Sequence, residues 1–124
     1  MNFETILYDV KDRIATITLN RPEHMNTWND QVATEVYEAM QAAGADRGVR
    51  VIVFTGAGKA FCAGGDIHSF GGDPAALMTK LPHPFDMRKR ADWQTRCSYY
   101  PAIPKPVIAM LNGATVGIGL IHAL

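Results

Sequence analysis

The stretch 49-VRVIVFT-55, followed closely by 59-KAFCAGGDI-67, decides the fold class of this chain. The first segment is an almost continuous run of β-branched and apolar residues, which is typical of a strand buried in a parallel sheet. In the second, Gly64 and Gly65 let the main chain approach a ligand closely, and Asp66 can cap a following helix. This order indicates an α/β protein whose backbone N–H groups are offered to an anion.

Before this strand, the sequence predicts a hairpin and one helix. Residues 5–10 and 14–19 are short strand candidates separated by a polar turn, so we expect them to pair antiparallel. Apolar residues then recur at helical spacing from Trp28 onward. We expect that helix to be capped by Asn26 or Thr27 and to fade near Gly44.

After the glycine-rich turn, the pattern of strand and glycine-rich turn occurs a second time. Residues 69–100 are predicted to form a variable insertion over the site, with a helix over 85–100. A second buried strand over 107–111 then leads into 112-NGATVGIG-119, which predicts another strand-to-helix turn. Two such turns can bring backbone amides together.

Composition limits the classes of function. The 124 residues are enough for one domain, and the balance of 12 Lys plus Arg against 12 Asp plus Glu predicts no nucleic-acid partner. Cys62 and Cys97 lie in no metal-ligand spacing, so we expect no metal site. The sequence shows no export signal and no membrane span, which predicts a soluble cytoplasmic protein.

Three strings together resemble the enoyl-CoA hydratase/isomerase (crotonase) family. They are 20-NRPEHMN-26, 61-FCAGGDI-67 and 105-KPVIAMLNG-113 continuing to 117-GIG-119, in the order and spacing of that family and over nearly all of the chain. The resemblance implies a spiral of ββα units, assembled as trimers or pairs of trimers. It also implies an acyl-CoA substrate, with coenzyme A as part of the substrate and no separate cofactor.

The resemblance assigns roles to the two turns. It implies that the backbone N–H groups of Gly65 and Ile118 hold the thioester carbonyl and stabilise an enolate. Fixed amide donors of this kind contribute roughly 10² to 10³ in rate each. The coenzyme is expected to lie against two segments, whose residues are Glu23, His24 and Met25 in the first and Ala63, Gly64, Gly65, Asp66 and Ile67 in the second.

The acid and base groups depart from the hydratase pattern. Where a hydratase of this family carries its first glutamate this chain has Ile121, and the second position lies beyond Leu124. Hydration needs paired carboxylates, so an isomerase, hydrolase, lyase or decarboxylase is favoured over a hydratase. On a helix His122 points about 100° away from Ile121, which argues against it as the base.

Residues 119–124 begin an apolar helix without a glycine cap or a polar last turn. Family members are about twice as long, so we expect the amino-terminal half of a crotonase-like domain, with apolar surface exposed. One alternative is a catalytically incomplete chain that binds coenzyme A or a partner subunit. Another is a nucleotide-binding module, although Ala60 follows the 56-GAGK-59 string where a P-loop requires Ser or Thr.

Several side chains have two interpretations. Arg88, Lys89, Arg90 and Arg96 could bind coenzyme phosphates or form a solvated helix face. Phe85 and Trp93 could line an acyl pocket or fill the core. Cys62 is interpreted as a small apolar residue, because its neighbours supply no base or cation.

Overall fold

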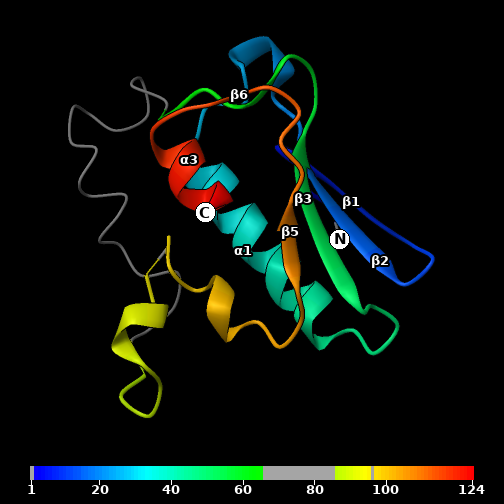
Figure 1. Ribbon diagram of the computed structural model, residues 1–124, viewed down its shortest axis with the longest axis vertical. Helices are drawn as coiled ribbons and strands as arrows, with labels where there is room; N and C mark the ends of the chain where they lie inside the picture. The colour runs from blue at the N-terminus through cyan, green and yellow to red at the C-terminus, as the bar shows by residue number, and fades with distance from the viewer. Residues whose placement is uncertain (1, 66–85, 96) are drawn as a thin grey trace.

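The computed structural model describes residues 2–65, 86–95 and 97–124. Its main sheet has the strand order β1-β2-β3-β5 (Figure 1). The strands β1 (Ile6–Lys11) and β2 (Ile14–Leu19) pair antiparallel, which confirms the predicted hairpin. The next two strands, β3 (Val51–Gly56) and β5 (Val107–Ala109), both run parallel to β2.

A second, two-stranded sheet lies beyond the end of the first. It joins β4 (Ala60–Cys62) and β6 (Ala114–Thr115) in parallel. The remaining elements are short: the 3₁₀ turns η1 (Pro22–His24), η2 (Ala91–Trp93) and η3 (Tyr100–Ala102), and the helix α3 (Ile118–Ala123). The glycine-rich turns therefore follow strands of this small sheet and not strands of the main one.

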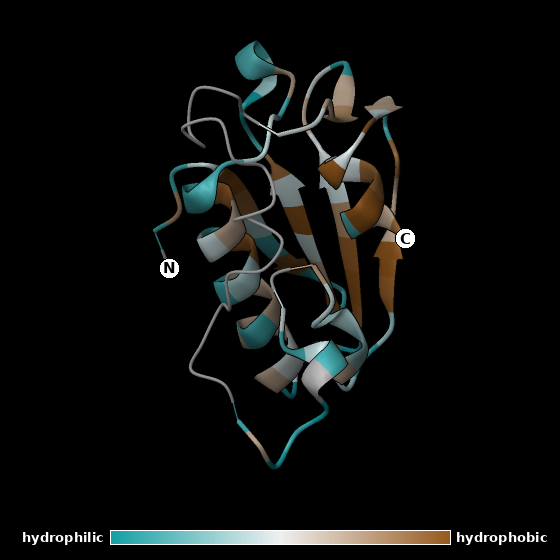
Figure 2. Ribbon diagram, turned by 90° about the vertical axis from the view of Figure 1, so that its left-hand side faces the viewer, coloured by the Kyte–Doolittle hydropathy of each residue, from teal (hydrophilic) through white to brown (hydrophobic). Residues whose placement is uncertain are grey.

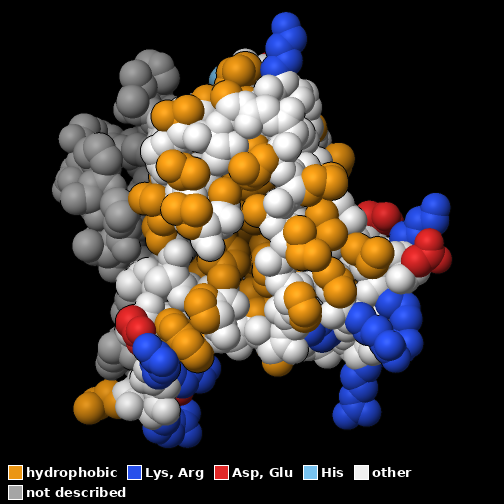
Figure 3. All heavy atoms as spheres, viewed as in Figure 1, with side chains coloured by type: hydrophobic (Ala, Val, Ile, Leu, Met, Phe, Trp, Pro, Cys, Tyr) orange, Lys and Arg blue, Asp and Glu red, His pale blue; other side chains and the backbone are white. Residues whose placement is uncertain are grey.

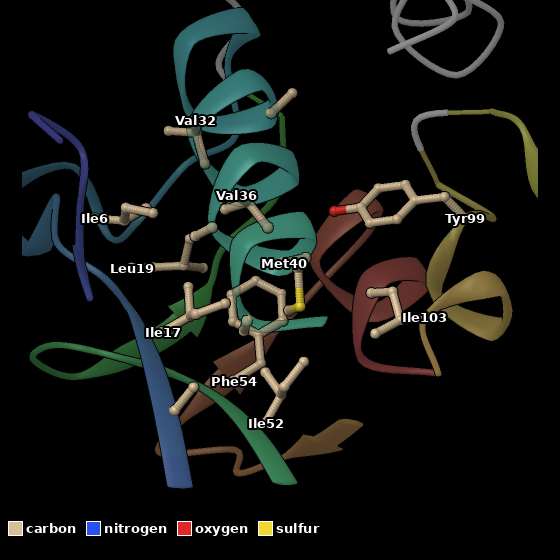
Figure 4. Close-up of a cluster of buried hydrophobic side chains, with 14 of the residues drawn as sticks. Ile6, Ile17, Leu19, Val32, Val36, Met40, Ile52, Phe54, Tyr99 and Ile103 are labelled. Atoms are coloured by element: carbon tan, nitrogen blue, oxygen red, sulfur yellow. The ribbon is translucent and has the colours of Figure 1, made fainter. Parts of the chain in front are cut away.

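The core lies between the main sheet and the helix α1 (Asp30–Ala45). In β2 every second side chain is buried, and the same alternation in β3 places Ile52 and Phe54 in the core. Figure 4 shows these side chains meeting those of α1, and in Figure 2 the strands are mostly brown. The largest core side chains on the main sheet and α1 are Ile6, Ile17, Leu19, Val32, Val36, Met40, Ile52 and Phe54.

The predicted start of the first helix was wrong. Asn29 is the N-cap, and its side-chain oxygen accepts a hydrogen bond from the N–H of Val32 at 2.8 Å. Trp28 precedes the helix and forms a parallel bridge with Gly65. The side chain of Trp28 is buried, as are the apolar side chains of the helix. Its spacing from them therefore led to its assignment to the helix.

The helix predicted over 85–100 is also wrong for the residues that the structure describes there. That part of the chain contains only η2 and the start of η3. The buried amide of Gln94 donates to the carbonyls of Asp86, Lys89 and Arg90 and accepts from the N–H of Asp86. The side chain thus replaces the helical ladder as the partner of these backbone groups.

The second predicted strand is shorter and less buried than expected. It ends at Ala109, and Ile108 is 52% exposed. Among the described residues, β5 pairs only with β3 and is therefore an edge strand. No helix in the described ranges is both long and apolar enough to cross a membrane.

Candidate active site at two glycine-rich turns

The small sheet brings the two glycine-rich turns together. Because β4 and β6 are parallel, their carboxyl ends lie on the same side, and each strand leads directly into one turn. The N–H of Val116 donates to the carbonyl of Cys62 at 3.0 Å, which extends the pairing to the base of both turns. Residues 63–65 and 116–118 are consequently neighbours.

Glycine is required for this approach at three positions. Gly64 has φ +128° and Gly117 has φ +56°, and a Cβ built on Gly117 would lie 3.9 Å from the Cα of Gly64. At Gly119, a Cβ would lie 2.6 Å from the carbonyl oxygen of Cys62. The absence of side chains at these points lets α3 begin directly against the end of β4.

The first predicted donor belongs to a peptide whose other end is fixed. The N–H of Trp28 donates to the carbonyl of Gly64 at 2.8 Å. Since the peptide unit is planar and trans, the N–H of Gly65 must point away from Trp28. Among the residues that the structure describes, this N–H has no hydrogen-bond acceptor.

The second predicted donor is arranged in the same way. The carbonyl of Gly117 accepts the N–H of Ile121 at 3.1 Å, so the N–H of Ile118 points out of the start of α3. Within the described ranges it too has no acceptor. An accepted hydrogen bond polarises a peptide, which strengthens the N–H at its other end. The two turns thus present two oriented donors.

The predicted coenzyme-binding residues fall into three groups. Glu23 and His24 lie on the exposed turn η1 and Met25 is its C-cap, whose carbonyl accepts the N–H of Ala63 at 3.1 Å. That bond places the end of η1 beside residues 63–65. Asp66 and Ile67, as well as the expected helix after them, lie outside the described residues.

Two asparagines support the loop between β3 and β4. The amide of Asn26 donates to the carbonyls of Ala57 and Ala60, each at 2.9 Å, and its oxygen accepts from the N–H of Arg21. Asn112 donates to the carbonyls of Gly58 and Ala60. Neither was predicted as a support, although the left-handed φ of Asn26, +54°, is a conformation that asparagine tolerates.

His122 is buried beside Trp28 and Tyr100. Its ring stacks on that of Trp28, with ring centroids 4.0 Å apart, and its Nδ1 lies 2.5 Å from the hydroxyl of Tyr100. Burial lowers the pKa of His122 to about 3 and raises the pKa of Tyr100 well above its ordinary value. The imidazole is therefore neutral near pH 7.

The other candidate side chains are paired locally or buried. Arg88 pairs with Asp86, and Arg90 with Asp92, so these cations have local partners; Arg96 is outside the described residues. Burial raises the pKa of Cys62, as expected of a small apolar residue. No cluster of three potential metal ligands occurs in the described ranges.

A cavity of about 340 Å³ lies next to α3. It is lined by Phe54, Trp93, Cys97, Tyr100, Ile121, His122 and neighbouring residues, which include none of the glycine-rich turns. Trp93 thus reaches a cavity, whereas Phe85 is outside the described residues. The geometry of the donors is a better guide to the chemistry than the size of this cavity.

The model of the family described as enoyl-CoA hydratase/isomerase matches residues 9–124. The chain belongs to the enoyl-CoA hydratase/isomerase family. It has the α/β crotonase fold over the part that it spans, as the three sequence strings predicted.

Individual members of the family agree with this assignment. The chain is 34% identical over 121 residues to a 1,2-epoxyphenylacetyl-CoA isomerase of Escherichia coli and 37% identical over 125 residues to a probable enoyl-CoA hydratase of Mycobacterium tuberculosis. These alignments cover 98% of this chain but only 45% and 44% of the relatives. A crystal structure of an enoyl-CoA hydratase/isomerase from Xanthobacter autotrophicus superposes with a TM-score of 0.76 at 32% identity, over 99% of this chain and 44% of that one.

Proposed function

We propose that this chain binds an acyl-CoA thioester and stabilises its enolate between the N–H groups of Gly65 and Ile118. The observation that carries the proposal is the adjacency of two peptides whose carbonyls are fixed and whose N–H groups have no acceptor in the described residues. Removal of a proton from the carbon next to a thioester places negative charge on the carbonyl oxygen. Two oriented amides stabilise that charge without a side chain.

The coenzyme is proposed to lie across the two segments that meet at Met25 and Ala63. Their backbone contact places the exposed turn η1 next to the first donor peptide. Because Met25 is 41% exposed, its side chain is available to a ligand and is not used to fill the core. From the family resemblance, we propose that the whole protein assembles as trimers or pairs of trimers in the cytoplasm.

For the reaction, we propose isomerase, hydrolase, lyase or decarboxylase chemistry ahead of hydration. Residues 118–124, which comprise α3 and the residue after it, contain no Asp or Glu. The apolar Ile121 occupies the position where the family resemblance implies a glutamate. Water addition to an enoyl thioester needs carboxylates to orient water and move protons. Stabilisation of an enolate is common to all four favoured reactions.

Acetoacetyl-CoA gives a direct test, because its enolate absorbs ultraviolet light much more strongly than its keto form. An enolate-stabilising site should lower the pH at which the bound ligand ionises, and thermal shift with coenzyme A should report binding separately. Ile118 is the first residue of α3, a position that tolerates proline. Ile118→Pro should therefore delete the donor N–H while keeping the helix.

We expect Ile118→Pro to raise the ionisation pH of bound acetoacetyl-CoA by about two pH units, the equivalent of one lost donor. Ile118→Val keeps the N–H and a similar apolar side chain, so it serves as the matched control. Equal ionisation in the two variants would contradict the proposed role of Ile118. Ionisation of the bound ligand at the same pH as the free ligand would contradict enolate stabilisation altogether.

The alternative function is binding of coenzyme A or a partner subunit without catalysis. The neutral, buried state of His122 and the apolar Ile121 favour it, since neither supplies a proton-transfer group at α3. Thermal stabilisation by coenzyme A with no change in the ionisation of bound acetoacetyl-CoA would support this alternative.

A further inference from the structure

Three aromatic side chains from distant parts of the sequence meet beside the two donor peptides. Trp28 precedes α1, Tyr100 belongs to η3 and His122 to α3. The rings of Trp28 and His122 stack at 4.0 Å with an angle of 23° between their planes, and both residues are buried, with exposed fractions of 1% and 5%. We refer to Trp28, Tyr100 and His122 as the aromatic cluster.

One end of this cluster is bonded to the first donor peptide. The backbone N–H of Trp28 donates to the carbonyl of Gly64 at 2.8 Å, and Trp28 forms a parallel bridge with Gly65. Because the Gly64 carbonyl and the Gly65 N–H belong to one planar unit, a rotation or shift of Trp28 changes the direction of that N–H.

The other end of the cluster belongs to the second donor. His122 lies one turn after Ile118 on the same short helix, so the position of its ring and the position of the Ile118 N–H move together. The hydroxyl of Tyr100, 2.5 Å from Nδ1 of His122, fixes the orientation of the ring. Its other nitrogen, Nε2, lies 3.6 Å from the sulfur of Cys97, so both edges of the imidazole are in polar contact.

We propose that the aromatic cluster sets the separation and relative orientation of the Gly65 and Ile118 N–H groups. Its members are positioning residues, since the cluster acts on the thioester only through the two peptides. This role rests on the proposed oxyanion hole. The direct backbone contacts between the turns, such as Val116 N–H to the Cys62 carbonyl, fix how closely the strands approach, whereas the stacked rings fix how α3 is turned against Trp28.

Tyr100→Phe is the sharpest test, because it removes one hydroxyl and keeps the ring. In the ligand-free protein we expect the backbone amide NMR signals of Gly65 and Ile118 to move, although Tyr100 belongs to neither turn. Bound acetoacetyl-CoA should lose roughly tenfold or more in enolate population at fixed pH, because small displacements of fixed donors have large effects. Coenzyme A binding should be nearly unchanged, since the exposed η1 turn is not part of the cluster.

Two matched comparisons separate positioning from general loss of stability. Tyr37→Phe removes a hydroxyl from a ring that lies 4.9 Å from Tyr99 in the same region, and it should move neither signal nor the enolate population. Trp28→Phe keeps a ring for stacking and should retain most of the enolate population that Trp28→Leu loses.

The outcomes distinguish this inference from the proposed function. If Tyr100→Phe and Trp28→Leu change the two amide signals and the enolate population no more than Tyr37→Phe does, the positioning role is overturned, while enolate formation by the unmodified chain still supports the proposed function. If the unmodified chain forms no enolate, the proposed function fails. In that case the NMR signals of the Gly65 and Ile118 amides test the positioning role without the ligand. Signals that do not move in Tyr100→Phe and Trp28→Leu would overturn the positioning role.

Discussion

The buried imidazole of His122 makes stability depend on pH. Its pKa is lowered to about 3 by burial, whereas in the unfolded chain it titrates near the usual value of about 6.5. Between these two values the unfolded chain binds a proton that the folded chain does not bind. The free energy of unfolding is therefore undiminished by His122 above about pH 6.5, and it decreases as the pH falls from there toward about 3.

We expect His122 to contribute a loss of about 1.4 kcal/mol in the free energy of unfolding for each pH unit below about 6. Urea unfolding at several pH values between about 4 and 7 would measure it. His122→Phe keeps a ring against Trp28 and removes the titrating group, so its stability should vary less with pH. Parallel pH profiles for the two proteins would show that other groups cause the dependence.

Gly119 is the residue at which a single methyl group should separate the two turns. A Cβ there would lie 2.6 Å from both the Cβ and the carbonyl oxygen of Cys62, so α3 would have to move away from β4. We expect Gly119→Ala to lower the free energy of unfolding by about 1–3 kcal/mol and to reduce the enolate population of bound acetoacetyl-CoA. Gly48→Ala is the control, because Gly48 is exposed, its φ is not positive and it lies outside both turns.

Among the elements, the loop between β3 and β4 depends on asparagine more than α1 does. Asn26 is buried and makes three side-chain hydrogen bonds, two to carbonyls at the ends of this loop and one to the N–H of Arg21, whereas Asn29 makes one as the cap of α1. We expect a loss of about 3 kcal/mol for Asn26→Ala and about 1 kcal/mol for Asn29→Ala, measured by denaturant unfolding. Equal losses would mean that the loop keeps its shape without Asn26.

Elements built from local patterns could be predicted, and those built from distant contacts could not. The hairpin, the parallel strand β3 and the two turns followed from alternation, β-branched runs and glycine placement. The predicted helix over 85–100 was wrong for residues 86–95, because the side chain of Gln94 makes the hydrogen bonds to the backbone there. The periodicity of the sequence does not reveal such bonds. Trp28 was assigned to the helix because its spacing from the next apolar residues fits a helix. Spacing does not show that the ring is buried against His122, before the helix begins.

The same distinction holds for the site. The string resemblance implied that the coenzyme lies against residues 23–25 and 63–67, and the structure joins the described parts of these segments by the bond from Ala63 to Met25. The contact of Trp28 with His122 spans 94 positions of sequence and leaves no motif. Physical pairing of this kind is visible only once the chain is folded.

At the scale of the whole molecule, one face of the chain is markedly apolar. Figure 3 shows hydrophobic side chains gathered over the face on which β5 and α3 lie. Those more than a third exposed between β5 and the last residue are Ile108, Met110, Leu111, Val116, Leu120, Ile121 and Leu124. Since β5 is also an edge strand in the described part of the chain, this face favours association.

We expect the isolated chain to self-associate as its concentration rises, which sedimentation velocity would detect. Ile108→Lys and Leu120→Lys together should shift it toward the monomer, because each places a charge on this face. A matched pair on the exposed side of α1, which covers the other face of the sheet, is Thr34→Lys and Glu38→Lys, and this pair should not. A chain that stays monomeric at high concentration would contradict the expectation.

The donors described at Gly65 and Ile118 are main-chain groups, so an alanine scan leaves them in place. An ester in place of the amide between Gly117 and Ile118 would replace the N–H by an oxygen and keep every side chain. Cys97 lies upstream in the sequence, so residues 97–124 can be synthesised with that ester and joined to a recombinant segment through the cysteine. The chemistry of this site is therefore open to editing one backbone atom at a time.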